Sequence, residues 1–358
     1  MKQRFLSLIL IIVMLLTLGS CFGSESTTQT TATPPPPTDG STLSVHFIDV
    51  GQADAALVFC DGKVLMIDGG DRSDSDLIYT YLKKHNVTHI DYMVCTHAHE
   101  DHVGGLPGAL TYATVGTVYA PVTSHDTQVF SKFVSKVEER GSFITVPQPG
   151  TRFSLGAANV TILGPVKDYT ETNNTSIILR VEFGKTSFLF TGDMEHDAEI
   201  DLIESGAMLS STVLKVGHHG SSTSSSYRFV REVAPAYAVI SVGTDNEYGH
   251  PNEDVLSRYR DADVKLYRTD LQGDIICTSD GETVSFATAK NSGIQTNPTE
   301  KPDDNTESDT VGCIGNKNSK IYHKPDCSHL PAESNRTEFK TTNDADEAGY
   351  RACEKCYP

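Results

Sequence analysis

The segment Thr96-His97-Ala98-His99-Glu100-Asp101-His102-Val103-Gly104-Gly105 decides the fold of this chain. It brings three histidines and an aspartate together in the pattern HxHxDH, and glycines follow directly after the next residue. Imidazole is a good zinc ligand, and carboxylates suit both zinc and harder divalent ions. The preceding run 90–95 is short, mostly apolar and rich in β-formers, which predicts a buried strand. The segment therefore predicts a metal site at the carboxyl end of a strand, where open α/β sheets place their sites.

Two later segments also end apolar strands with metal-ligand side chains. The run SFLFTGD closes on Asp193, and the run VLKVGHHG at 213–220 closes on His218 and His219. A histidine-rich surface loop is the alternative interpretation, but four ligand-type side chains in the pattern HxHxDH directly after a strand argue against it. Three such strand ends in this order favour a single shared site.

The HxHxDH pattern resembles the signature of the metallo-β-lactamase-fold hydrolases, an α/β family with an αββα sandwich. The resemblance implies two divalent metal ions, one bound by the first two histidines and one by the Asp-His pair. Asp193 is similar to the family's bridging aspartate, and His218 to its last ligand. His219 is the alternative for that ligand, and could instead support the site or act on the substrate. The metal ligands that the resemblance implies are His97, His99, Asp101, His102, Asp193 and His218.

The histidine that this family carries between these elements is absent, because no histidine lies between His125 and His196. The chain offers Asn173-Asn174-Thr175-Ser176 there, and this departure resembles the extracellular hydrolase domain of ComEC competence proteins. The runs FIDVGQADA, LKVGHHGSSTSSS and YGHP resemble the same domain, over about residues 43–288. The third protein ligand of the first metal therefore stays open between Asn174 and water.

The same motifs suggest residues for substrate and catalysis. Asn174, Ser221 and Ser222 are candidates to bind phosphate oxygens, although capping of the next helix would also explain some of the serines. His250 follows a predicted strand, so it is a candidate either for contact with the substrate or leaving group or for fixing its loop. The candidate catalytic residues are Asp101, His219 and His250.

The apolar periodicity predicts the organisation of residues 43–290 as one domain. Strands are expected at 43–48 and 63–67, helices at 74–84 and 128–139, and hairpin-like pairs at 177–190 and near 264–286. Mixed strands and helices in this order suit the fold that the resemblance implies, two mixed sheets packed face to face with helices outside. A chain of 358 residues accommodates one domain of about 250 residues and a smaller module.

The N-terminus is typical of an exported lipoprotein. Two cations precede an apolar run at 5–18, and Leu18-Gly19-Ser20-Cys21 resembles a bacterial lipobox, which predicts a signal peptide at 1–21 and lipidation of Cys21. An uncleaved membrane anchor is the alternative. Residues 22–42 are rich in Ser, Thr and Pro and predict a stiff tether. We therefore expect a membrane-anchored protein on the extracellular or periplasmic side.

The C-terminus predicts a second metal site. Residues 291–310 have the composition of a disordered linker, and the module at 311–358 is too small for a large core. Two ligand pairs, His323 with Cys327 and Cys353 with Cys356, predict one structural Zn²⁺ in an α+β module. The module resembles the zinc-binding domain of Ada-type DNA repair proteins, with His323 where that family has its methyl-accepting cysteine. Disulfides involving Cys313 are the alternative in an oxidising compartment.

These patterns predict a hydrolase that uses two metal ions, Zn²⁺ or Mn²⁺, to activate water against a phosphodiester. DNA is the favoured substrate by analogy with ComEC and Ada. A phosphocholine ester or another cell-wall polymer is one alternative, and a non-catalytic DNA-binding surface lipoprotein is another. The net charge of −18, from 47 acidic and 29 basic residues, argues against broad electrostatic attraction to nucleic acid or an anionic membrane. A local metal pair could still bind phosphate, and the sequence identifies no protein partner.

Overall fold

The computed structural model of the chain describes residues 40–296, 312–325, 327 and 329–357. The predicted signal peptide, Cys21, most of the tether at 22–42 and most of the linker at 291–310 lie outside the described residues and stay predictions. Within the described ranges, no helix is long and apolar enough to cross a membrane.

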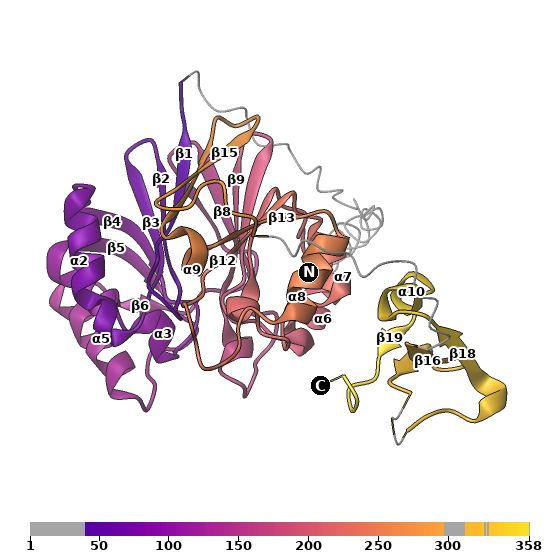
Figure 1. The fold of residues 1–358 in the computed structure, drawn as a ribbon. Coiled ribbons are helices and arrows are strands. Elements are labelled where there is room, and N and C mark those ends of the chain that lie inside the picture. The colour runs from indigo at the N-terminus through magenta and orange to yellow at the C-terminus, as the bar shows by residue number, and fades with distance from the viewer. Residues whose placement is uncertain (1–39, 297–311, 326, 328, 358) are drawn as a thin grey trace, which may run out of the picture. The chain divides into compact units, whose positions relative to one another are not determined.

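Residues 40–296, here the large domain, contain two mixed sheets that lie face to face (Figure 1). The first sheet has the order β15-β14-β1-β2-β3-β4-β5-β6, and the second has the order β13-β12-β11-β10-β9-β8-β7. The strands of the first sheet are β1 (Leu43–Phe47), β2 (Ala55–Cys60), β3 (Lys63–Gly69), β4 (His89–Val94), β5 (Thr114–Tyr119), β6 (Ile144–Thr145), β14 (Ile275–Ser279) and β15 (Val284–Thr288). Those of the second are β7 (Arg152–Leu155), β8 (Ala158–Gly164), β9 (Ile178–Phe183), β10 (Thr186–Phe190), β11 (Val213–Lys215), β12 (Tyr237–Ile240) and β13 (Lys265–Arg268).

Helices cover the outer face of each sheet (Figure 1). Those on the first sheet are α2 (Ser75–Lys84), α4 (Leu106–Tyr112) and α5 (Gln128–Glu139), and those on the second are α6 (His196–Glu204), α7 (Tyr227–Val233) and α8 (Glu253–Asp261). Short helical segments occur at η1 (Arg72–Asp74), α3 (Glu100–Val103), η2 (Asn173–Thr175), η3 (Gly217–Gly220) and α9 (Thr269–Gln272). The helices predicted at 74–84 and 128–139 are confirmed as α2 and α5. In α5, Phe130, Phe133 and Val137 recur at helical spacing and are buried, and the Thr127 side chain caps the first turn.

Three apolar layers hold the domain together. One lies between the first sheet and its helices, one between the two sheets, and one between the second sheet and its helices. Phe47 and Phe190 stack across the middle layer with their ring centroids 6.0 Å apart. Because both faces of each sheet are covered, the central strands are buried throughout, as in β10. The αββα sandwich expected from the sequence is confirmed.

One expected element is wrong in detail. The hairpin predicted near 264–286 is two structures, because β13 pairs with β12 in the second sheet, whereas β14 and β15 form an antiparallel hairpin in the first. Helix α9 and Gly273, with φ of 67°, carry the chain from one sheet to the other. Strand alternation identifies each strand, but it carries no information about which sheet the strand joins.

The C-terminal module forms its own sheet with the order β18-β16-β17-β19. Its elements are β16 (Cys313–Asn316), β17 (Ile321–His323), η4 (Glu333–Asn335), β18 (Arg336–Phe339), α10 (Thr342–Glu347) and β19 (Arg351–Ala352). Its buried apolar cluster consists of Cys313, Tyr322, Ala345 and Tyr350. In the large domain, Thr296 is still buried and donates its hydroxyl to the Leu266 carbonyl, beyond the predicted boundary at 290.

Candidate metal centre

The HxHxDH segment follows the carboxyl end of β4 directly, and His99 is the N-cap of α3. The glycines after it have a steric role. A Cβ on Gly105 would lie 1.9 Å from the carbonyl oxygen of Gly69, which ends β3. Only glycine allows this close approach. The loop is thereby pressed against β3, and its ligands face the ends of neighbouring strands.

Asp193 lies at the centre of the cluster, three residues after β10. The Nε2 atom of His102 lies 3.2 Å from Asp193 Oδ1. Asp193 Oδ2 has three imidazole Nε2 atoms around it, those of His97 at 3.9 Å, His218 at 3.7 Å and His219 at 3.7 Å. One carboxylate is thus shared by four imidazoles that come from two distant segments of the chain.

Four of these side chains form a compact group whose ligand atoms all lie within 4.8 Å of one another, namely Asp101, His102, Asp193 and His219. His102 Nε2 and Asp193 Oδ1 are both buried and lie 3.2 Å apart, but neither makes a well-directed hydrogen bond with any described residue. Unpaired buried polar atoms are rare in folded proteins. Nitrogen and carboxylate donors in this arrangement fit a divalent cation that would satisfy both atoms.

His97 and His99 form a second pair beside this group. Their Nε2 and Nδ1 atoms are 3.0 Å apart, and His97 is fully buried while His99 is exposed. Burial lowers the pKa of His97 well below 6.5, and the neighbouring His102 lowers it further. His97 is therefore a neutral imidazole, which is the form that binds metals.

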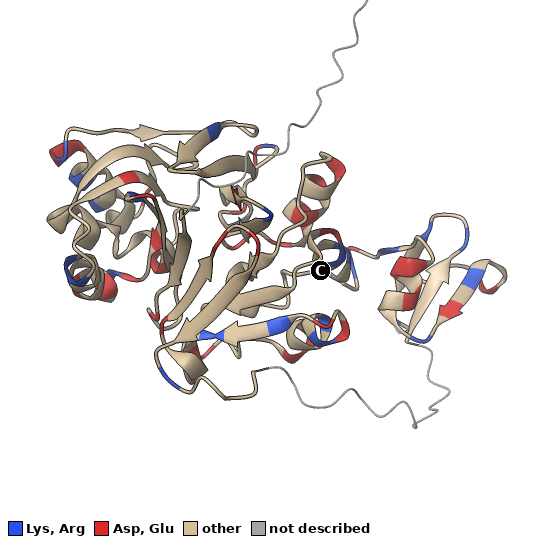
Figure 2. Cartoon of the chain, turned by 90° about the horizontal axis from the view of Figure 1, so that it is seen from above, with Lys and Arg blue, Asp and Glu red and all other residues tan. Residues whose placement is uncertain are grey.

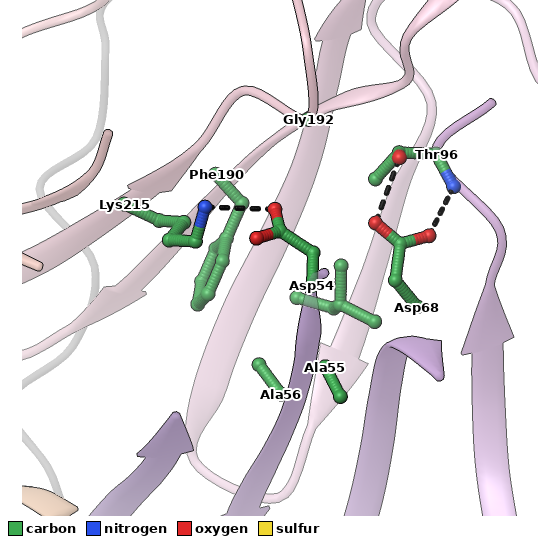
Figure 3. A pocket seen from close by; sticks show the side chains of 9 residues that line it. Asp54, Ala55, Ala56, Asp68, Thr96, Phe190, Gly192 and Lys215 are labelled. Carbon is green, nitrogen blue, oxygen red and sulfur yellow. Dashed lines mark hydrogen bonds and ion pairs between the residues drawn. The ribbon is translucent and has the colours of Figure 1, made fainter. Parts of the chain in front are cut away.

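Acceptors behind the cluster fix the orientation of its rings. His102 Nδ1 lies 2.9 Å from Asp68 Oδ2, and His219 Nδ1 lies 3.0 Å from the carbonyl oxygen of Ser241. Carbonyl and carboxylate oxygens only accept, so Nδ1 carries the proton in each ring and Nε2 faces Asp193. Asp68 also accepts from the backbone N–H and the hydroxyl of Thr96 (Figure 3).

A buried ion pair lies beside Asp68. Lys215 Nζ is 2.7 Å from Asp54 Oδ2, and the two side chains are 5% and 6% exposed (Figure 3). The other oxygen of Asp54 lies 3.4 Å from His219 Nδ1. The Lys215 ammonium holds the pKa of Asp54 far below its usual value despite the opposing effect of burial. Asp54 therefore presents a full negative charge behind the His219 ring.

In the absence of metal, His102, His219 and Asp101 in this cluster are ionised. Burial opposes the charge of each, but the Asp193, Asp68 and Asp101 carboxylates raise the pKa of His102 well above its usual value. Asp193 and Asp54 raise the pKa of His219 to about 10 in the same way. The neighbouring imidazoles lower the pKa of Asp101 to about 2 against the effect of burial. The site is thus built for positive charge between its carboxylates.

The structure brings the predicted ligands together, but it distinguishes His218 from His219. His219 is buried and belongs to the compact group with its Nε2 3.3 Å from Asp101 Oδ2. His218, which the resemblance predicted as the family's last ligand, is 22% exposed, and its Nδ1 lies 3.4 Å from Glu195 Oε1. The ligand assignment stays a prediction, and the geometry favours His219 for the second metal.

The predicted substrate residues differ in their surroundings. Asn174 is buried, and its Oδ1 accepts from the backbone N–H of Glu195. Ser221 is buried against Thr223, whereas Ser222 is exposed. In the same run, Ser226 caps α7, so the capping interpretation holds for that serine.

His250 lies beside the cluster, with its ring centroid 5.8 Å from that of His218. Its Nδ1 is 3.3 Å from Gln52 Nε2, and Gln52 Oε1 accepts from the backbone N–H of Gly243. Because the amide nitrogen donates, Nδ1 of His250 accepts and its proton is on Nε2. Burial, reinforced by His218 and His219, lowers the pKa of His250 to about 4. The residue is a neutral donor at neutral pH.

Sequence reasoning assigned no role to three supporting residues, Asp54, Lys215 and Glu195. The first two lie inside the motifs FIDVGQADA and LKVGHHG, next to the residues that were singled out. An ionisable residue in or next to an otherwise apolar strand is the signal that could have identified Lys215. Glu195 follows Asp193 closely, but no pattern in the sequence relates it to His218.

The C-terminal module contains a second cluster. The ligand atoms of His323, Cys327, Cys353 and Cys356 all lie within 4.8 Å of one another. Parallel pairing of β17 and β19 brings His323 and Cys353 to the same sheet end. Backbone N–H groups of Lys324 and His329 donate to the sulfurs of Cys356 and Cys327. All cysteines among the described residues are free, and Cys313 lies outside the cluster, donating to the Thr341 carbonyl.

Two packed sheets between helices, with histidines and aspartates gathered at the strand ends, define a metal-binding hydrolase of the αββα class. Residues 48–244, more than half of the chain, match the model of the metallo-beta-lactamase superfamily. The chain belongs to this superfamily. Residues 303–358 match the metal binding domain of Ada.

The similar proteins include competence proteins. ComE operon protein 3 of Bacillus subtilis (strain 168) is 29% identical over 250 residues, which are 64% of this chain and 32% of that protein. Competence protein ComA of Neisseria gonorrhoeae is 33% identical over 228 residues, 63% of this chain and 30% of that protein. The chain thus spans about a third of the length of these relatives. The metallo-beta-lactamase fold protein YhfI of Bacillus subtilis aligns with 63% of this chain and 95% of its own, at 14% identity and a TM-score of 0.43.

Proposed function

We propose that the large domain is a metal-dependent phosphodiesterase that cleaves DNA, held at the outer face of a membrane through lipidated Cys21. The observation that carries the proposal is the convergence of four imidazoles on Asp193, with Asp101 beside them. The similarity to competence proteins supports DNA as the substrate. The Ada-like module supports the same substrate class.

The residues of the cluster divide between two cation positions. His97, His99 and Asp193 would hold one ion, and Asp101, His102 and His219 would hold the other, with Asp193 shared. Two divalent ions supply a water of lowered pKa and neutralise charge on phosphoryl oxygens. Asp68 and the Ser241 carbonyl keep the imidazoles of His102 and His219 aimed at this position.

Two residues are placed for proton handling. Asp101 is ionised and its side chain is 34% exposed, whereas Asp193 is only 2% exposed, so Asp101 can orient the attacking water by accepting its hydrogen bond. His250 keeps a proton on Nε2 at neutral pH and can donate a hydrogen bond to the leaving oxygen. In Figure 2 the Lys and Arg positions of the described residues are distributed along the ribbon among Asp and Glu, and the net charge is −18, so recognition would be local to the site.

The test is hydrolysis of single-stranded DNA, double-stranded DNA and p-nitrophenylphosphocholine by the purified chain with Mn²⁺ or Zn²⁺. We expect DNA cleavage, and Asp193→Ala should lower it on the order of a thousandfold or more because both cation positions lose a ligand. Asp76→Ala is the matched control, since Asp76 is an exposed aspartate in the first turn of α2. Cleavage of the phosphocholine ester alone would favour a cell-wall substrate. Metal-independent DNA binding without cleavage would favour a binding protein.

A further inference from the structure

The first metal position lacks a protein ligand in the sequence, since this chain has no histidine between His125 and His196. Asn174 was the candidate from the sequence. Its Oδ1 lies 2.9 Å from the backbone nitrogen of Glu195 and accepts that N–H, and the residue is 5% exposed. Because turning Asn174 towards a metal would take the acceptor from this N–H, we treat Asn174 as a structural residue.

We infer that His218 supplies the missing ligand of the first metal, while His219 serves the second. This inference rests on the two-metal site of the proposed function. His218 Nε2 and His97 Nε2 lie 3.7 and 3.9 Å from the same atom, Asp193 Oδ2. His219 Nε2 is also 3.7 Å from that oxygen, but it lies closer to Asp101 Oδ2, at 3.3 Å. His219 therefore belongs to the second group, with Asp101 and His102, and His218 remains for the first metal.

The hydrogen bonds of His218 place its lone pair on the correct atom. The Thr223 hydroxyl donates to Glu195 Oε1 at 3.0 Å, so its oxygen accepts from His218 Nδ1 at 3.2 Å. Glu195 Oε1 itself lies 3.4 Å from His218 Nδ1. The proton of the imidazole is thus on Nδ1, and Nε2 faces Asp193 with a free lone pair. Metal-binding histidines show this pattern of a carboxylate or hydroxyl behind the ring.

The backbone explains how two adjacent residues serve one site. His218 has φ of 50° and ψ of 44°, and His219 has φ of 54° and ψ of 22°. In an extended strand two successive side chains would point to opposite faces. Two successive left-handed residues instead bring both Nε2 atoms to 3.7 Å from Asp193 Oδ2. Left-handed conformations are unfavourable for residues other than glycine, and such strain concentrates at functional sites.

The location of His218 also fits the position of the missing ligand. Asn173 Nδ2 donates to Glu195 Oε1 at 3.2 Å, and this is the oxygen that faces His218 Nδ1. The segment 173–176, where the family's histidine is absent, therefore contacts His218 through one carboxylate. A ligand from η3 replaces one from the segment before β9.

The experiment is a calorimetric titration with Mn²⁺. Before the titration, the metal-free full chain receives one equivalent of Zn²⁺, which fills the thiolate cluster of the C-terminal module. Mn²⁺ prefers nitrogen and oxygen ligands, so it reports the large domain. We expect two ions in the wild type. In His218→Asn one ion should bind at least about tenfold more weakly, while the other keeps its affinity. Asparagine tolerates the left-handed conformation, and the thermal unfolding of each variant in EDTA checks its fold.

Double variants identify which ion is affected. Combining His218→Asn with His97→Asn should leave one Mn²⁺ bound, because both changes act on the same ion, whereas combining it with His219→Asn should weaken both. Asn174→Ala should keep two ions. If His218→Asn binds two ions as tightly as the wild type, or if Asn174→Ala loses the same ion, the inference alone is overturned. A wild-type chain that binds no Mn²⁺ overturns the proposed function as well.

Discussion

The two metal-ligand clusters of this chain differ in what surrounds them. The cluster around Asp193 lies at the ends of strands whose three apolar layers fold the large domain. The cluster around His323 belongs to a module whose buried apolar cluster has only four residues in the described part of the chain. The first site is therefore an addition to a core that exists without it. In the second, the metal has to supply much of the folding free energy.

The largest effect is expected in the C-terminal module, when it loses its metal. Cys353→Ser, or chelation of the metal, should abolish amide protection across β16–β19, because structural zinc contributes about 10–16 kcal/mol of apparent binding free energy. Hydrogen exchange measured by mass spectrometry on the full chain follows both regions at once. The large domain should keep its protection in both cases, and in Cys353→Ser it should also keep its activity on a small phosphodiester.

Ser319→Ala is the control, because Ser319 is exposed in the turn between β16 and β17. Exchange should not change in this variant. A module that stays protected after chelation, and loses protection only with reductant, would contradict a metal-dependent fold and favour disulfides.

An intermediate effect is expected from the ion pair that supports the large domain's site. Lys215→Met leaves the Asp54 carboxylate buried without its cation, so the free energy of unfolding should fall by about 3–5 kcal/mol. Urea unfolding of the metal-free chain measures this change. Adding Asp54→Asn to Lys215→Met should recover part of the loss, because no uncompensated charge then remains. A change below about 1 kcal/mol in the single variant would show that water or a rearranged partner satisfies Asp54.

The smallest effect is expected from His46, which tests the core of the large domain independently of its metal site. His46 is 8% exposed, and its Nδ1 forms a hydrogen bond with Tyr81 Oη. In sequence it is distant from the histidines of the metal cluster. Burial, reinforced by His85 and Lys84, lowers the pKa of His46 from 6.5 to about 4. Below pH 6.5 the unfolded chain therefore binds more protons than the folded one, and stability falls as pH drops from about 6.5 to 4.

We expect this pH dependence to amount to at most about 3 kcal/mol. His46→Phe should reduce it, as measured by urea unfolding of metal-free protein at pH 4.5 and pH 7. An unchanged difference between the two pH values would assign the acid sensitivity to other groups.

Prediction from the sequence succeeded where local pattern and local structure coincide. Helix α5 spans the predicted residues because its apolar spacing and the Thr127 cap lie within the segment itself. The HxHxDH loop follows a strand as expected, since strand and loop are continuous. The prediction of one hairpin near 264–286 was wrong because packing between distant segments decides which sheet β13 joins.

The sequence by itself determined the types of ligand, their order along the chain and the strand ends that carry them. Only the tertiary structure decided how they are shared around Asp193, that Asn174 is held by Glu195, and that His218 and His219 face different partners. The physical reason is that ligation depends on where a ring nitrogen points. That direction is fixed by hydrogen bonds to residues such as Asp68, Ser241 and Thr223, which are distant from their partners in sequence or carry no recognisable pattern.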